Sequence, residues 1–144
     1  MRLLSVLSFV LLGLGPCALA QEAVAVSQPG VTMTALGGPV SDATTSLLWR
    51  GNWFVRTKVA VETWTFDQEY ALTVEARNPR LGRSAGVVNL VSGAPARDLV
   101  RDIDRGLIWL FTTGDATLNY VATAPAGAPG GSETHVVTYT ITQQ

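Results

Sequence analysis

The sequence predicts an all-β protein, a single antiparallel β-sandwich of two sheets, with a small closed β-barrel as the alternative. Thr and Val are frequent, Gly and Pro recur along the chain, and short segments alternate apolar with polar side chains. Such alternation buries one face of a strand and exposes the other to water. The short connections between the segments favour antiparallel pairing.

The alternating segments are separated by turn residues such as Gly, Pro and Asn. We expect strands at residues 24–26, 31–36, 46–49, 53–66, 70–76, 86–91, 107–112, 117–123 and 134–142. Several short strands at this spacing are typical of two packed sheets.

The clearest alternation lies in segment 53–66, where Val and Thr side chains share one face and Arg56, Lys58 and Glu62 share the other. Trp64 and Phe66 have the parity of the charged residues. Because a one-residue slip moves side chains to the opposite face, we predict a bulge or bend near Thr63.

The next segment alternates equally well, and residues 67–69 are expected to form the loop of a hairpin between the two strands. Its inward side chains are Tyr70, Leu72 and Val74, and its outward ones are Thr73, Glu75 and Arg77.

Residues 96–105 are the exception to the β pattern. Leu99, Val100 and Ile103 have helical spacing, Pro95 suits a first helical turn, and Gly106 suits a helix end. The pattern predicts a short helix or helical turn across one end of the sheets, with a turn-rich crossover loop as the alternative.

The first 20 residues have the pattern of a cleavable export signal. Arg2 precedes a short apolar run, and Ala18 and Ala20 occupy the small-residue positions before a cleavage site. The run is shorter than the roughly 20 residues of a membrane-spanning helix. We therefore expect export to the periplasm, the cell surface or the medium, with residues 21–144 forming one domain.

Cys17 raises an alternative, because bacterial lipoproteins are cut before a lipidated cysteine. Pro16 departs from the small residue expected there. Cleavage after Ala20 would leave a chain without cysteine, with nine basic and eleven acidic residues. Such a chain is held by its core alone, and its mild acidity argues against nucleic-acid binding.

No catalytic, cofactor-binding or metal-binding residues are expected. His135 is the single histidine, no Gly-x-Ser-x-Gly elbow is present, and a zinc site lacks ligands. We expect His135 to be a strand residue with its ring partly in solvent.

Two groups of carboxylates are candidates for chemistry. Glu62 and Glu75 could form the acid pair of a small hydrolase, although the alternation places both on the wetted face among basic residues, where ion pairing is the simpler interpretation. A calcium site is the alternative to a solvated charged face for the acids interleaved with arginines, which are Asp98, Asp102 and Asp104.

Tryptophans and arginines are the candidate ligand contacts. Exposed indoles stack on sugar rings, which makes Trp49, Trp53 and Trp64 candidates, whereas Trp109 lies in an apolar run and is assigned to the core. Core or edge packing is the alternative for the first two. Arg80 and Arg83 belong to a basic loop with Arg77 that could contact an anionic glycan.

Residues 118–123, a Pro/Gly-rich loop and residues 136–142 resemble the closing hairpin of bacterial immunoglobulin-like envelope domains. The resemblance implies a surface or fimbria-like structural or adhesive module without a cofactor. The chain departs from chaperone-assembled pilins, which have a cysteine pair. Residues 23–26 could be donated to another subunit, but we expect them to pair within their own domain.

These observations predict an exported, non-enzymatic envelope or surface protein, a β-sandwich used for structure, adhesion or protein contact. Its partners would be other envelope proteins or further copies that associate by strand pairing. A glycan-binding module is the alternative, and a carboxylate-dependent hydrolase is the weaker one.

Overall fold

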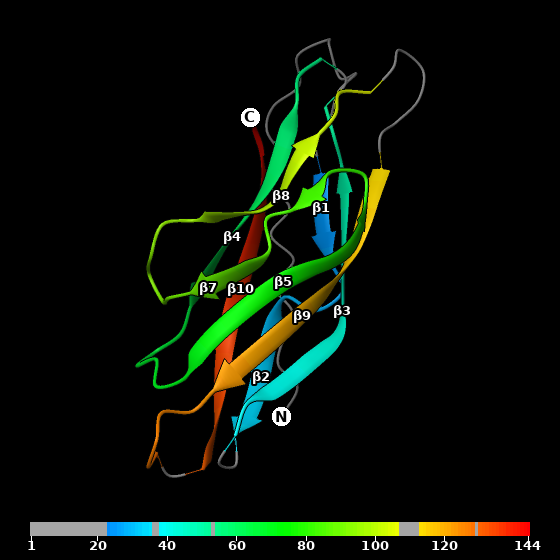
Figure 1. The fold of residues 1–144 in the computed structure, drawn as a ribbon. Helices are drawn as coiled ribbons and strands as arrows, with labels where there is room; N and C mark the ends of the chain where they lie inside the picture. Colours follow the sequence, from blue (N-terminus) through cyan, green and yellow to red (C-terminus); the bar gives the residue numbers. More distant parts are fainter. Residues whose placement is uncertain (1–22, 36–37, 53, 107–112, 129) are drawn as a thin grey trace, which may run out of the picture.

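The computed structural model describes residues 23–35, 38–52, 54–106, 113–128 and 130–144. In these residues the chain forms ten strands in two stacked five-stranded antiparallel sheets, which confirms the predicted sandwich (Figure 1). No helix of the described part is long and apolar enough to cross a membrane. The predicted export signal, strand 107–112, Trp53 and Trp109 lie outside the described residues.

Each sheet combines strands from distant parts of the sequence. Sheet A has, in spatial order, β1 (Ala23–Val26), β3 (Val40–Arg50), β9 (Thr113–Thr123), β5 (Ala71–Arg80) and β7 (Val87–Leu90). Sheet B has β2 (Gly30–Ala35), β10 (Gly131–Gln143), β4 (Thr57–Trp64), β8 (Arg97–Ile103) and β6 (Arg83–Ser84).

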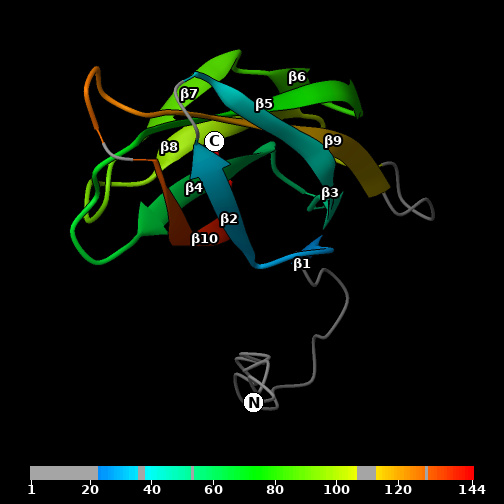
Figure 2. The ribbon, with the colours of Figure 1, turned by 90° about the horizontal axis from the view of Figure 1, so that it is seen from below.

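The core lies between the sheets and is built by alternation. On β5 the predicted inward residues Leu72 and Val74 are buried, while Arg77 is exposed. Seen from below, β5 and β9 lie across the molecule from β10 (Figure 2). Inward side chains from both sheets form one apolar cluster, which includes Leu118, Val59 and Val137.

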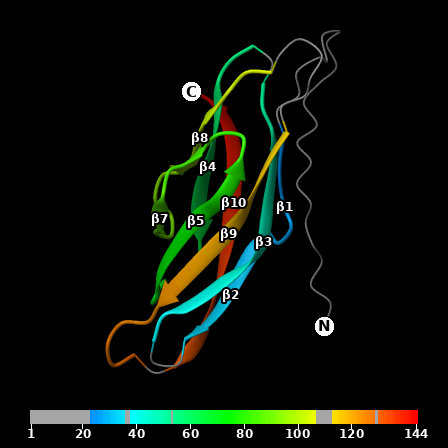
Figure 3. The same cartoon turned by 45° about the vertical axis from the view of Figure 1, so that its right-hand side comes forward.

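Two predicted hairpins are wrong. β4 belongs to sheet B and β5 to sheet A, so residues 67–69 lie in a crossover between the sheets. Likewise β9 pairs with β3 and β5, whereas β10 pairs with β2 and β4. The two halves of the supposed closing hairpin therefore lie in different layers (Figure 3).

The N-terminal strand pairs inside its own domain, as expected. β1 runs antiparallel to β3, and β2 pairs with β10 in the other sheet. Between them the Ser27 N–H donates to the Ser46 carbonyl at 2.9 Å, and the Ser46 N–H donates to Ser27 Oγ at 2.9 Å. The segment thus closes one side of both layers.

The predicted helix at residues 96–105 is wrong, because this segment is strand β8. Ala60 faces Asp98 and Val59 faces Val100, which leaves Leu99 as an extra residue on β8. A second extra residue follows where Asp102 adopts a φ of 53°. Each bulge shifts by one residue which positions of β8 face the core. The buried residues Leu99, Val100 and Ile103 therefore have the spacing expected of a helix although they lie on a strand.

The predicted bulge near Thr63 is also absent from the pairing of β4 with β10, which continues without a shift from Thr57 to Trp64. Trp64 and Phe66 keep the parity of Glu62 and are exposed. The prediction failed because it assumed that large aromatic side chains must be buried, whereas Trp64 at the end of β4 and Phe66 just beyond it both face solvent.

Trp49 is a core residue, and a glycine on the neighbouring strand makes room for it. Its cross-strand partner on β9 is Gly114, and a Cβ on Gly114 would collide with the indole ring and with the Arg80 carbonyl. The indole is 2% exposed. Trp49 is therefore packing and not a binding platform.

A buried pair of tyrosine hydroxyls joins the sheets. Tyr120 on β9 and Tyr139 on β10 are hydrogen-bonded through their hydroxyl oxygens. Burial raises the pKa of Tyr120 to about 12, and burial beside Tyr120 raises the pKa of Tyr139 further above its usual value. The folded state thus strongly favours the protonated phenols.

We predict that the free energy of unfolding falls as the pH rises above about 10. The unfolded tyrosines then ionise while the folded ones stay protonated, which costs about 1.4 kcal/mol per pH unit for each tyrosine. Urea denaturation of the double variant Tyr120→Phe/Tyr139→Phe should show a shallower fall than Tyr70→Phe, which removes a phenol outside the pair. An equally steep fall in both variants would contradict this account.

Candidate functional site

The most prominent exposed apolar surface lies where β4 ends. Trp64 is 60% exposed, Phe66 is 85% exposed, and Val136, directly opposite Trp64 on β10, is 54% exposed. Thr65 between the aromatic residues is buried, so Trp64 and Phe66 share the outer side of the chain. We call Trp64, Phe66 and Val136 the aromatic platform.

The crossover that carries Phe66, residues 65–70, is hydrogen-bonded to β7 and to the turn after it. The Gln68 side-chain amide donates to the carbonyls of Tyr70 and Leu90 at 2.9 Å each, and its oxygen accepts from the Ser92 N–H at 2.7 Å. Ser92 Oγ in turn donates to the Thr65 carbonyl at 2.8 Å and accepts from the Thr65 N–H at 2.9 Å. These bonds fix the backbone beside Phe66.

The other side of the crossover is held by Glu133 on β10. Its Oε2 accepts from the backbone N–H groups of Glu69 at 2.8 Å and Tyr70 at 3.1 Å. Its Oε1 lies 2.5 Å from His135 Nε2 but accepts no well-aligned hydrogen bond. A carboxylate so placed favours a hydrogen on Nε2, because an ionised oxygen only accepts.

His135 is buried, at 1% exposure, which corrects the expectation of a ring partly in solvent. On β10 its parity is that of Val137 and Tyr139, so it faces the core. Thr63 Oγ1 lies 3.4 Å from Nδ1 and donates to the Val136 carbonyl at 3.2 Å.

Hydroxyl, imidazole and carboxylate thus stand in the order of a nucleophilic triad. Thr63 is only 4% exposed, its proton is directed to a carbonyl, and His135 is almost wholly covered. A substrate carbonyl has no approach to this hydroxyl, whereas catalysis requires contact with it. The cluster joins β4, β10 and the crossover.

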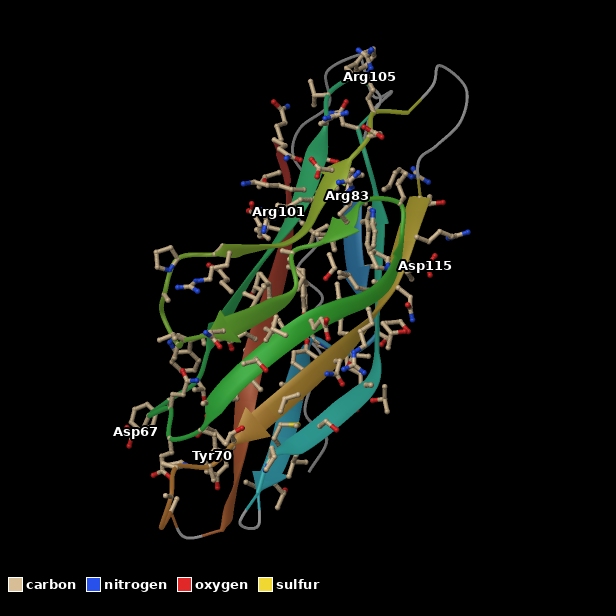
Figure 4. All side chains as sticks on the ribbon, viewed as in Figure 1. Asp67, Tyr70, Arg83, Arg101, Arg105 and Asp115 are labelled. Carbon is tan, nitrogen blue, oxygen red and sulfur yellow. The ribbon has the colours of Figure 1, made fainter. Side chains whose placement is uncertain are left out.

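Cavities flank the crossover on both sides. One of about 700 Å³ lies against β7 and includes Gln68, Asn89 and Ser92 in its lining. The other, of about 360 Å³, is lined by Phe66, Asp67, Glu69, Gly131 and Glu133 among others. Asp67 and Tyr70 mark this end of the molecule in Figure 4. An exposed aromatic ring therefore stands beside carboxylates on a fixed backbone.

The other predicted ligand contacts are not brought to this site. Arg80 pairs with Asp115 on β9 at 2.5 Å, in sheet A. Arg83 lies on β6 at the edge of sheet B, opposite Arg101. Of the three candidate tryptophans, only Trp64 is both described and exposed.

The carboxylates considered for catalysis lie in different sheets. Glu62 is exposed on β4, and Glu75 on β5 pairs with Arg77 at 3.1 Å. The pairing of strands that would have placed the two acids side by side does not occur.

The acids considered for calcium are engaged by side chains from other parts of the chain. Asp98 pairs with Lys58 at 2.8 Å, Asp104 pairs with Arg56 at 3.0 Å, and Asp102 exchanges two hydrogen bonds with Gln144. Among the described residues, no group of three or more His, Cys, Asp or Glu side chains is placed to hold a metal ion.

Phe66, Val136 and Glu133 were missed as parts of the site. The parity shared by Phe66 and Trp64 was visible in the sequence, but it was interpreted as a bulge. The role of Glu133 could not be inferred, because its partners lie 63 and 64 residues away in the sequence.

No known family model matches the chain, and no curated protein matches its sequence. Among solved structures, the chain is similar to one titled "Structure of infectious bursal disease virus Gx strain", with 11% sequence identity and a TM-score of 0.43. The similarity covers 92% of this chain and 35% of that chain. This chain therefore spans about a third of the viral protein's length.

We predict that Glu133→Ala lowers the free energy of unfolding by about 1–3 kcal/mol, because it leaves the backbone N–H groups of Glu69 and Tyr70 without their acceptor. Amide hydrogen exchange at Glu69 and Tyr70 should accelerate in the same variant. Glu62→Ala, which removes an exposed carboxylate from the same sheet, should change stability by less than about 0.5 kcal/mol. Unchanged exchange at Glu69 and Tyr70 would show that Glu133 does not hold the crossover.

Proposed function

We propose that the chain is an exported, non-enzymatic β-sandwich module of the cell envelope or surface that works by contact with another protein. The observation that carries this proposal is the aromatic platform. Large apolar side chains exposed together on one sheet face indicate an interaction surface, whereas single exposed ones need no explanation.

The chemistry of the platform suits a protein partner. Trp and Phe are enriched at the centres of interfaces, where a large apolar area is covered with little loss of side-chain entropy. The crossover beside them is held by Gln68, Ser92 and Glu133, so little ordering is required on binding. The nearby Asp67 and Glu69 would supply a polar rim.

A glycan-binding module is the second candidate, and the exposure of Trp64 favours it. An indole face stacks on a sugar ring, and carboxylates such as Asp67 and Glu69 accept hydrogen bonds from sugar hydroxyls. In this candidate function, the cavity beside Phe66 would receive the sugar.

The two candidate functions differ in the molecule that contacts Phe66, which is a protein in the first and a glycan in the second. We predict that a photo-crosslinker, p-benzoylphenylalanine, in place of Phe66 captures a discrete protein in the cells that make the chain. The same group in place of Phe54, which is 69% exposed elsewhere, should give no such product. Trp64→Ser in the Phe66-substituted chain should abolish the product, because it removes a neighbouring part of the contact.

Glycan binding would instead appear as quenching of Trp64 fluorescence by an oligosaccharide and as loss of that quenching in Trp64→Phe. Crosslinking that is equally strong from positions 54 and 66 would contradict the protein-contact proposal. Trp64→Ser should change the free energy of unfolding by no more than about 0.5 kcal/mol, since the residue is largely exposed.

Export is tested separately by the mass of the chain recovered outside the cytoplasm. We predict that this chain begins at Gln21 and carries no lipid, because cleavage follows the small residues at 18 and 20. A chain that keeps Met1 and stays in the cytosol would contradict export. A lipidated Cys17 would show instead that the exported chain is tethered to a membrane.

A further inference from the structure

The arginines divide into paired and unpaired sets that occupy different places. Four basic side chains form ion pairs with acidic ones, and these are Arg56, Lys58, Arg77 and Arg80. Four others form no ion pair with any described residue, and these are Arg83, Arg97, Arg101 and Arg105. All four unpaired arginines lie on β6, on β8 or two residues beyond β8, and all are exposed.

Two of these arginines face each other. Arg83 on β6 and Arg101 on β8 are direct partners in the antiparallel register. Like charges in opposed positions destabilise a pair of strands. The turn before β6 sets this arrangement, because Gly82, with a φ of 89°, lies so close to β8 that a Cβ would touch the Arg101 carbonyl.

The acidic residues nearby are already engaged. Asp98 and Asp104 pair with Lys58 and Arg56 of the neighbouring chain segment, and Asp102 is hydrogen-bonded to Gln144. Around β6 and the second half of β8 there are therefore five basic side chains (Arg56, Lys58, Arg83, Arg101 and Arg105) against these three acidic ones, a local excess of two positive charges. The net charge of the whole chain is −1. The excess is a local feature that the overall composition conceals.

The unpaired arginines on β6 and along and beyond the second half of β8 are spread out and do not cluster around one small site. Arg101 and Arg105 are four residues apart, and a strand rises about 3.3 Å per residue, so the two positions are separated by up to roughly 13 Å. Arg97 lies on the other side of the bulge at Leu99, opposite the buried Val61, and is not part of this line. Figure 4 shows Arg101, Arg83 and Arg105 along the part of the molecule that leads away from Asp67 and Tyr70. A single small anion would meet at most two of these guanidinium groups.

We propose that this arginine strip, Arg83, Arg101 and Arg105, binds a linear anionic polysaccharide. Guanidinium groups bind carboxylate and sulfate groups through paired hydrogen bonds, and a repeating polymer presents such groups at intervals along its length. The aromatic platform, which could stack on nucleic-acid bases, lies at the opposite end of β4 from Arg56, so the strip lacks that stacking surface. The strip is distinct from the platform and requires neither export nor protein contact.

The test measures binding of the purified chain from Gln21 onward to heparin and to alginate, with oligothymidylate and phosphatidylglycerol-containing vesicles as competing classes. We expect binding to both polysaccharides that weakens as salt is added. The double variant Arg83→Gln/Arg101→Gln should lose about tenfold or more in affinity, since each guanidinium lost removes charge-assisted hydrogen bonds.

The matched control is Arg77→Gln/Arg80→Gln, which removes the same charge from paired arginines in sheet A and should change the affinity by less than about twofold. Equal losses in the two double variants would reduce the effect to net charge and overturn the proposal. So would absence of polysaccharide binding, or tighter binding to oligothymidylate or vesicles.

Folding is checked in the same variants by urea denaturation. Arg83→Gln/Arg101→Gln should be at least as stable as the parent chain, because it removes a like-charged pair. Trp64→Ser should keep full polysaccharide binding, so that failure of the platform and failure of the strip are distinguished. Loss of affinity in an unfolded variant would be recognised by its denaturation curve, and the single variant Arg83→Gln then provides the measurement.

Discussion

Burial of the inward-facing side chains between the two sheets is the interaction on which the rest of the structure depends. The chain has a single cysteine, so no internal disulfide can substitute for this burial. Leu47, Leu72 and Leu118 from sheet A and Val59, Leu99 and Ile103 from sheet B are all almost completely covered. Consecutive strands of the described residues alternate between the two sheets from β1 to β10, so every connection between them links the two layers.

Several polar groups buried in this interface are hydrogen-bonded and connect its parts, whereas Trp49 Nε1 and Thr57 Oγ1 have no hydrogen-bond partner among the described residues. The Tyr120 and Tyr139 hydroxyls bond across the layers, while Glu133, His135 and Thr63 connect β10, β4 and the crossover. Buried polar groups that find partners specify one arrangement of an apolar core, because any other arrangement would leave them unsatisfied. The crossover that carries Phe66 is therefore fixed by the same contacts that define the register of the sandwich.

The sequence was sufficient to predict the fold class and the buried face of strands such as β5, because alternation has a local cause. It was insufficient wherever long-range pairing decided the outcome. A short connection is compatible with a hairpin or with a change of sheet, which is why residues 67–69 were assigned wrongly. Two bulges in β8 gave Leu99, Val100 and Ile103 a helical spacing that only the pairing with β4 resolves. The burial of His135 follows from its parity with Val137, but its partner Thr63 lies 72 residues away.

The two surfaces proposed for binding are places where the local rules of a β-sandwich are broken. Trp64 and Phe66 expose aromatic rings on a solvent face, and Arg83 and Arg101 oppose like charges across an edge. The exposed aromatic rings reduce solubility, and the opposed arginines reduce stability. Neither has a compensating contact in the described part of the chain, as is expected of functional surfaces. One is apolar and lies beside carboxylates, while the other is cationic and follows β8. Because the two proposed surfaces lie toward opposite ends of sheet B, a ligand bound at one would not block the other.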